Sequence, residues 1–241
     1  MLNGKKGLIT GASSGIGKSA AKALAEEGVD LALTSRSKEK LDTLAEKITE
    51  KHDVDVYTLT ADVKKEKQVQ NLFEEVLNHF GQLDIVFANA GLGIGSSVEE
   101  MSSEDYNTMM DVNCDGMFFT AREAVPYLRE TQGNLVFTGS FAGQYPRPGN
   151  PVYAATKWWT RGLALSLSGQ VEDVAVTVIN PSEVRTNFAS EDGESFAERF
   201  EEGEVTEPED IAEAVVYAVR QEPPNEVSEI DLYRRDKLSG F

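Results

Sequence analysis

The chain has 241 residues, a single cysteine and a net charge of −18, from 41 acidic and 23 basic side chains. This length fits one compact domain, and the negative charge would repel nucleic-acid phosphates and anionic membranes, so neither is an expected partner. The lone cysteine excludes an intrachain disulfide, and His52 and His79 have no nearby histidine or cysteine that would suggest a metal pair.

Seven apolar runs of strand length alternate with helix-length segments along the chain. Their nearly continuous hydrophobicity is typical of strands that are covered on both faces of a parallel sheet. The runs span residues 7–10, 30–34, 54–60, 85–88, 135–138, 174–179 and 230–233. Amphipathic segments such as 38–51 lie between them. The alternation predicts one α/β domain over residues 1–241, with a doubly wound, Rossmann-like sheet of seven parallel strands and ligands at their carboxyl ends.

A glycine-rich turn follows the first predicted strand and precedes a predicted helix over residues 18–27. Gly11 permits a tight turn, Gly15 lets backbone amides approach a pyrophosphate, and Gly17 lets the helix pack closely on the strand. The helix N-terminus would direct unpaired N–H groups at the phosphates. Taken alone, the turn also fits an ordinary strand-to-helix connection, but its position favours a dinucleotide site. The predicted contacts from this turn are Gly11, Ser13, Ser14, Gly15, Ile16 and Gly17.

The end of the second predicted strand decides which dinucleotide is preferred. An acidic side chain there would accept from a ribose hydroxyl of NAD(H), whereas a guanidinium matches the 2′-phosphate of NADP(H). The chain has Ser35 and Arg36 at this position. We therefore predict NADP(H) as the cofactor, with NAD(H) less favoured. The alternative is that Arg36 is a solvated residue that opens the next helix.

Ser140, Tyr153 and Lys157 form a candidate catalytic group. Ser140 follows the fifth predicted strand, and Tyr153 and Lys157 share a helix face at positions i and i+4. A tyrosine is a poor acid–base catalyst at its reference pKa of ~10, and an adjacent cation favours the phenolate. Tyr153 would exchange a proton with the substrate oxygen, and Ser140 would position that oxygen. A tyrosine and a lysine at this spacing are usually structural when they occur alone. Here the preceding serine and the glycine-rich turn favour a catalytic role.

These motifs resemble those of the short-chain dehydrogenase/reductase family over nearly the whole chain, from residue 6 to about residue 233. Residues 10–17 have the family's TGxxxGxG spacing. Two residues in other motifs depart from the family pattern, since Ala88 stands where the family usually has Asn and Ser182 where it usually has Gly. The resemblance implies that Lys157 also holds the nicotinamide ribose. It also implies cofactor contacts in three further segments, namely from Asp62 and Val63, from Asn89, Ala90 and Gly91, and from Pro181, Val184 and Thr186.

The resemblance further implies that Asn113 is a fourth catalytic residue. In the family, this asparagine bends its helix and holds a water that links the lysine to a proton relay. An ordinary helical asparagine is the alternative. The family also forms dimers and tetramers through the helices that contain Asn113 and Tyr153, so a homodimer or homotetramer is expected. Trp158 and Trp159 would fit a buried interface about as well as a core position.

Residues 187–207 interrupt the alternation, because they are polar, acidic and short of strand-length apolar runs. We expect a substrate lid with a short helix, and the alternative is a solvated acidic insertion. Substrate selectivity is expected from this segment and from Gln144, Tyr145, Arg147 and Trp158. Arg147 or Arg185 would suit a substrate carboxylate.

The sequence thus predicts an oxidoreductase that transfers a hydride between NADP(H) and a small aldehyde, ketone or 3-hydroxy acid. The alternative is a non-catalytic nucleotide-binding sensor or scaffold of the same fold, and an epimerase or dehydratase fits less well, because it would need a further C-terminal substrate domain. No apolar run approaches the ~18 residues of a membrane span, and the first residues lack a signal-peptide core. We therefore expect a cytoplasmic protein. Its acidity would also fit a salt-rich cell, although the many lysines argue against an extreme case.

Overall fold

The computed structural model describes residues 2–188 and 194–238, and its centre is one sheet of seven strands. The spatial order is β3-β2-β1-β4-β5-β6-β7, and each neighbouring pair is parallel. The strands are β1 (Lys6–Thr10), β2 (Asp30–Ser35), β3 (Val56–Thr60), β4 (Ile85–Ala88), β5 (Asn134–Thr138), β6 (Ala175–Pro181) and β7 (Glu229–Leu232). This topology confirms the predicted doubly wound, Rossmann-like sheet.

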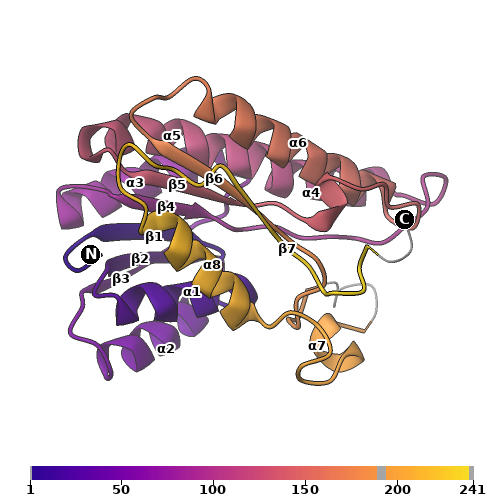
Figure 1. Cartoon of the computed structure of the whole chain (residues 1–241), viewed down its shortest axis with the longest axis horizontal. Helices are drawn as coiled ribbons and strands as arrows, with labels where there is room; N and C mark the ends of the chain where they lie inside the picture. The colour runs from indigo at the N-terminus through magenta and orange to yellow at the C-terminus, as the bar shows by residue number, and fades with distance from the viewer. Residues whose placement is uncertain (1, 189–193, 239–241) are drawn as a thin grey trace.

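Helices cover both faces of the sheet (Figure 1). One face carries α1 (Gly15–Glu26), α2 (Lys38–Thr49) and α8 (Pro208–Val219), and the other carries α3 (Glu66–Phe80), α4 (Ser103–Met110), α5 (Gly116–Thr131) and α6 (Pro151–Ser168). Three short elements complete the described chain, namely the π-helical turn η1 (Asp111–Asp115), the 3-10 turn η2 (Phe141–Gly143) and α7 (Phe196–Arg199). Among residues 2–188 and 194–238, no helix is long and apolar enough to cross a membrane.

The continuous hydrophobicity of the strands arises because successive side chains enter two separate cores. Ile9 and Leu31 point into the core under α1, α2 and α8, whereas Leu8 and Ala32 point into the core under α3, α5 and α6. Burying apolar area on both faces is the main favourable contribution to the stability of such a sheet.

Several boundaries differ from those expected from the sequence. Helix α1 begins at Gly15, inside the glycine-rich turn, rather than at residue 18, and β3 begins at Val56 rather than at residue 54. The last strand is Glu229–Leu232, one residue earlier than expected. Its sequence alternates charged and apolar residues, because it is an edge strand whose two faces lie in different surroundings.

The chain order reverses between β1 and β4. The first half of the sheet grows from β1 outward to β3, and the second half begins at β4 on the other side of β1. Side chains and turns that follow β1 and β4 therefore meet at one place above the carboxyl ends of the strands, where doubly wound sheets bind their ligands.

Candidate active site

The glycine-rich turn forms a close packing point between β1 and α1. A Cβ atom on Gly17 would lie only 2.4 Å from the Gly11 carbonyl oxygen and 2.6 Å from the Asn89 amide nitrogen, so no side chain fits there. The Ser14 side chain makes no capping hydrogen bond, and the first turn of α1 holds no acidic residue. The first amides of α1 and its positive dipole end are therefore available to an anion, and this geometry fits a dinucleotide pyrophosphate.

Asn89 ties together the ends of three strands at the switch point. Its side-chain amide donates to the Thr10 carbonyl oxygen at 3.0 Å, and the Thr138 hydroxyl donates to its Oδ1 at 3.0 Å. The Thr10 hydroxyl in turn accepts from the backbone N–H groups of Asn89 and Ala90 at 3.0 and 3.1 Å. The segment from Asn89 to Gly91 is thus fixed beside the glycine-rich turn.

The residues expected to select the dinucleotide lie at the same edge of the sheet. Arg36 is exposed directly after β2, and the Ser35 hydroxyl accepts from the Ser37 backbone N–H at 3.1 Å. After β3, the Asp62 carboxylate accepts from the backbone N–H of Lys64 at 3.1 Å, whereas Val63 is buried. These positions follow β2 and β3, at the same edge of the sheet as the first turn of α1.

Ser140 and Tyr153 are brought together by the contact of η2 with α6. Ser140 caps η2, and its Oγ accepts from the Ala142 backbone N–H at 3.1 Å. Helix α6 begins with Pro151 after the Asn150 cap, which places Tyr153 in its first turn. A Cβ atom on Gly143 would lie 2.7 Å from a backbone oxygen in α6, so η2 packs directly against that helix. The Ser140 hydroxyl is consequently near enough to the Tyr153 hydroxyl for a hydrogen bond between them to lower the pKa of the phenol.

The Lys157 ammonium lies over the Tyr153 ring. Its Nζ is 5.9 Å from the centroid of the Tyr153 ring and donates to the Thr138 carbonyl oxygen at 2.8 Å. Burial of this side chain, which is 2% exposed, lowers the pKa of Lys157 to about 8.

Burial also raises the pKa of Tyr153 to about 12, against smaller lowering effects from the hydrogen bond with Ser140 and the charge of Arg147. The sequence led us to expect that Lys157 lowers the pKa of Tyr153, but in the structure this pKa is raised. Removal from water is the largest influence on both pKa values, because desolvation disfavours the charged form of each group.

Asn113 lies at the centre of the π-helical turn η1 and is completely buried. Its Oδ1 accepts from the Leu92 backbone N–H at 3.0 Å, and its Nδ2 donates to the Leu92 carbonyl at 2.8 Å and to the Thr156 hydroxyl at 3.0 Å. The side chain thus joins η1 to the segment after β4 and to α6. The π turn coincides with the bend that the family resemblance implies at this residue.

The segment after β6 returns toward the glycine-rich turn. Pro181 ends β6, Val184 is buried, and the Thr186 side chain lies beside Gly15. Of the expected lid, residues 189–193 lie outside the described residues, and the remainder contains α7. Phe188, which the sequence did not single out, lies with its ring centroid 5.6 Å from that of Tyr153. An aromatic residue at the beginning of a polar segment was the only available signal.

The residues expected to select the substrate lie in different surroundings in the structure. Arg185 is paired with Glu207 through its Nε at 2.8 Å, whereas Arg147 is exposed and its charge reaches Tyr153. Gln144 is engaged in a polar network, and Tyr145 stacks on Phe141. Trp158 and Trp159 are 48% and 38% exposed, so neither belongs to the core.

Known proteins of one family are similar to this chain over most of its length. The model of the short chain dehydrogenase family matches residues 5–196. An uncharacterized oxidoreductase of Staphylococcus epidermidis is 32% identical over 231 residues, which cover 95% of this chain and 96% of that protein.

Two solved structures share the fold. An alcohol dehydrogenase from the archaeon Thermococcus sibiricus, complexed with 5-hydroxy-NADP, is 33% identical, with a TM-score of 0.89 over 95% of this chain and 96% of that one. A 3-ketoacyl-(acyl-carrier-protein) reductase from Brucella melitensis, complexed with NADH, is 27% identical, with a TM-score of 0.86 over 97% and 98%.

Proposed function

The chain belongs to the short-chain dehydrogenase family and is an oxidoreductase of that family, and from this premise we propose that it transfers a hydride between NADP(H) and a small carbonyl or alcohol substrate. The observation that carries the proposal is the approach of Ser140 and Tyr153 over the buried Lys157, next to the glycine-rich turn. Titratable side chains with perturbed pKa values beside a glycine-rich turn favour catalysis over simple binding.

Three side chains divide the work at the substrate. The bound nicotinamide would supply or accept the hydride. In reduction, Tyr153 donates its phenolic proton to the substrate oxygen as negative charge develops there, and in oxidation it removes that proton. Ser140 donates a hydrogen bond to the same oxygen and orients it. Lys157 would hold the nicotinamide ribose and adds positive charge near the phenol, while Asn113 joins α6 to η1 and to the segment after β4.

The preference for NADP(H) rests on Arg36. No carboxylate stands at the end of β2, where it would repel a 2′-phosphate, and the exposed guanidinium is available to bind one. The structurally similar proteins do not decide the matter, because one was solved with an NADP analogue and the other with NADH. The residue at the end of β2 therefore carries this part of the proposal.

Arg147 supports a substrate class that includes small 3-hydroxy acids. It lies on the connection between Ser140 and Tyr153, and no carboxylate partner is found for it among residues 2–188 and 194–238. A substrate carboxylate would supply that partner through a charge-assisted hydrogen bond. The segment 187–207 would cover the same site as a lid, with Phe188 as an apolar wall beside Tyr153.

We also propose that the chain forms a homodimer or homotetramer through α5 and α6 in the cytoplasm. Phe118, Trp158, Trp159 and Leu165 are exposed on these two helices. Exposed large apolar side chains are enriched at protein–protein interfaces. The single buried cysteine is compatible with a reducing compartment.

The test is a substrate screen with both dinucleotides. Loss of NADPH absorbance is followed with aldehydes and ketones, and its gain is followed with alcohols and 3-hydroxy acids. We expect turnover with at least one substrate, and we expect Tyr153→Phe to lower kcat by about 100-fold or more without loss of NADPH binding. Tight NADPH binding with no turnover by the wild-type protein would instead support a sensor or scaffold.

A further inference from the structure

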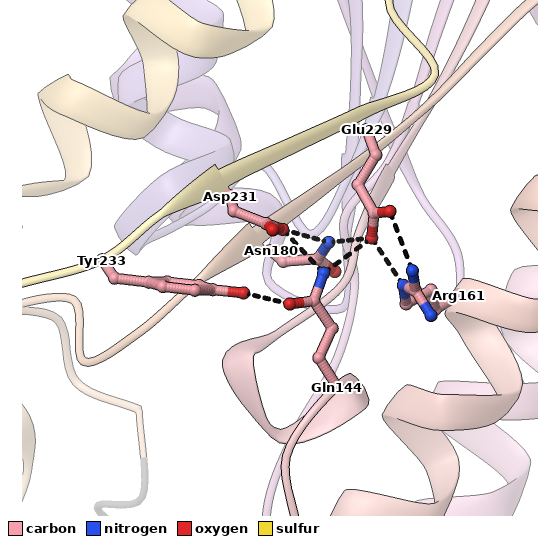
Figure 2. A network of polar contacts seen from close by, with 6 residues as sticks. All are labelled: Gln144, Arg161, Asn180, Glu229, Asp231 and Tyr233. Atoms are coloured by element: carbon pink, nitrogen blue, oxygen red, sulfur yellow. Dashed lines mark hydrogen bonds and ion pairs between the residues drawn. The ribbon is translucent and has the colours of Figure 1, made fainter. Parts of the chain in front are cut away.

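A polar network lies at the β6–β7 edge of the sheet (Figure 2), whereas the glycine-rich turn follows β1 near the middle of the strand order. The residues of the network come from the end of η2, from α6, from β6 and from the last strand with the residue that follows it. We refer to it as the β7 network, and its members are Gln144, Arg161, Asn180, Glu229, Asp231 and Tyr233.

Gln144 is the residue at which the β7 network meets the Ser140 turn. Its Nε2 donates to Glu229 at 2.8 Å and to Asp231 at 2.7 Å, and its Oε1 accepts from the Tyr233 hydroxyl at 2.5 Å. Both polar ends of the side chain are therefore held by the end of the sheet. Asn180 supports the same two carboxylates, because its Nδ2 donates to Glu229 at 2.6 Å and to Asp231 at 2.9 Å.

The charge balance makes the two amides necessary. Two carboxylates face one guanidinium, since Arg161 donates to Glu229 through Nε at 2.5 Å and through Nη2 at 2.9 Å. The facing oxygens of Glu229 and Asp231 would repel each other, and the amide hydrogens of Gln144 and Asn180 lie between them. Loss of either amide would remove one of the two amide donors that each of these oxygens shares, so the repulsion between them would increase.

The β7 network holds the Ser140 turn at both of its ends. Gln144 directly follows η2, and Asn180 packs against Gly139, where a Cβ atom would lie 2.1 Å from the Asn180 Oδ1. On its other side, the network reaches α6 through Arg161, which lies one helical turn after Lys157. The turn that carries Ser140 and the helix that carries Tyr153 are thus joined through Glu229.

We propose that Gln144 is a positioning residue, which holds the Ser140 hydroxyl in register with Tyr153 through the β7 network. It touches neither substrate nor dinucleotide in this role. The proposal rests on the proposed function, since it assigns a purpose to the Ser140–Tyr153 geometry. A small displacement of Ser140 lowers the rate of the chemical step, whereas dinucleotide binding at α1 is unaffected, because that site follows β1 and not the β6–β7 edge of the sheet.

The experiment compares Gln144→Met with the matched control Gln82→Met. Gln82 also donates through its amide to a carboxylate, that of Asp84 at 2.9 Å, but at the opposite end of the sheet. Steady-state kinetics gives kcat and the KM for NADPH. Hydrogen exchange measured by mass spectrometry follows the backbone amides of residues 139–146, and it does not depend on turnover. Tyr233→Phe removes only the phenolic hydroxyl, which donates to Gln144 and also interacts with Asp231, and it serves if Gln144→Met fails to fold.

We expect Gln144→Met to lower kcat at least about tenfold, since a misplacement of the order of 1 Å costs up to about 100-fold. The KM for NADPH stays unchanged, and exchange in residues 139–146 accelerates, while the control changes neither quantity. Tyr233→Phe produces smaller changes in the same direction.

The positioning role is overturned if exchange in the turn is unchanged, or if it accelerates while an active enzyme keeps its wild-type kcat. A wild-type protein without turnover on any substrate would defeat the proposed function, and the exchange rates would then decide alone whether Gln144 fixes the turn.

Discussion

Replacing Lys157 by methionine should stabilise the dinucleotide-free protein while it abolishes catalysis. Burial lowers the pKa of Lys157 from an ordinary 10.5 to about 8. At about 1.4 kcal/mol per pH unit, the charged ammonium therefore destabilises the folded state by about 3 kcal/mol at neutral pH. Methionine removes this penalty with a side chain of similar length, but it leaves the Thr138 carbonyl without its donor, at a cost of about 1–2 kcal/mol. The expected net gain is about 1–2 kcal/mol in the free energy of unfolding.

The pH dependence of this gain has a definite sign. A lysine whose pKa is lowered by folding is penalised fully below pH 8, where both states are protonated. The penalty falls as the pH rises from about 8 to 10.5, because the folded protein loses its proton first, and it vanishes above that range. There the wild-type amine still donates to Thr138, so the order reverses and Lys157→Met becomes the less stable protein.

Urea unfolding at pH 7 and at pH 10.5, with the exposed Lys51→Met as the control, measures both effects. At neutral pH, the gain corresponds to a rise in Tm of about 2–8 °C for a chain of this size. A Lys157→Met protein that is less stable than wild type at pH 7, or whose advantage does not depend on pH, would refute the argument that burial of a charge at this site is costly.

Three further substitutions test the dinucleotide and substrate sites. Gly17→Ala should destabilise the protein by about 1–3 kcal/mol and abolish NADPH binding in calorimetric titration, because the new Cβ would overlap the Gly11 carbonyl; wild-type affinity would contradict the close packing. Arg36→Asp should lower the ratio of kcat/KM for NADPH to that for NADH by at least about tenfold, and an unchanged ratio would exclude a phosphate contact. Arg147→Gln should raise the KM for 3-hydroxy acids about tenfold, the equivalent of one charge-assisted hydrogen bond, and leave neutral alcohols unaffected; an equal change for both would exclude a carboxylate contact.

The parts of the site that were predictable from the sequence are those encoded locally. The glycine-rich turn can be identified because its three glycines, within eight residues, meet the backbone requirements of a tight turn and of close packing. The buried strands can be identified because the residues on both of their faces are apolar. The pairing of Tyr153 with Lys157 follows in the same way from one helical turn. The doubly wound arrangement of the sheet also followed, because the alternation of elements leaves few other topologies.

The β7 network could not have been predicted in this way. Gln144 and Glu229 are separated by 85 positions, and each is unremarkable in its own segment, one after a short turn and the other in an edge strand. From the sequence we expected Gln144 to contribute to substrate selectivity, because none of its contacts within the protein could be predicted. Only the fold reveals that its amide is used between two carboxylates, and Phe188 beside Tyr153 is hidden for the same reason.

The effect of burial on the pKa values of Tyr153 and Lys157 could not be predicted from their spacing in the sequence. Positions i and i+4 indicate that Tyr153 and Lys157 share a helix face, but not whether desolvation or the neighbouring charge determines their pKa values. In the structure desolvation dominates, since it raises the pKa of Tyr153 to about 12 and lowers that of Lys157 to about 8. At neutral pH the phenol therefore keeps its proton, which is the form that donates to a developing alkoxide. The protonated phenol is the form that the proposed carbonyl reduction needs, whereas the proposed oxidation needs the phenol to accept a proton.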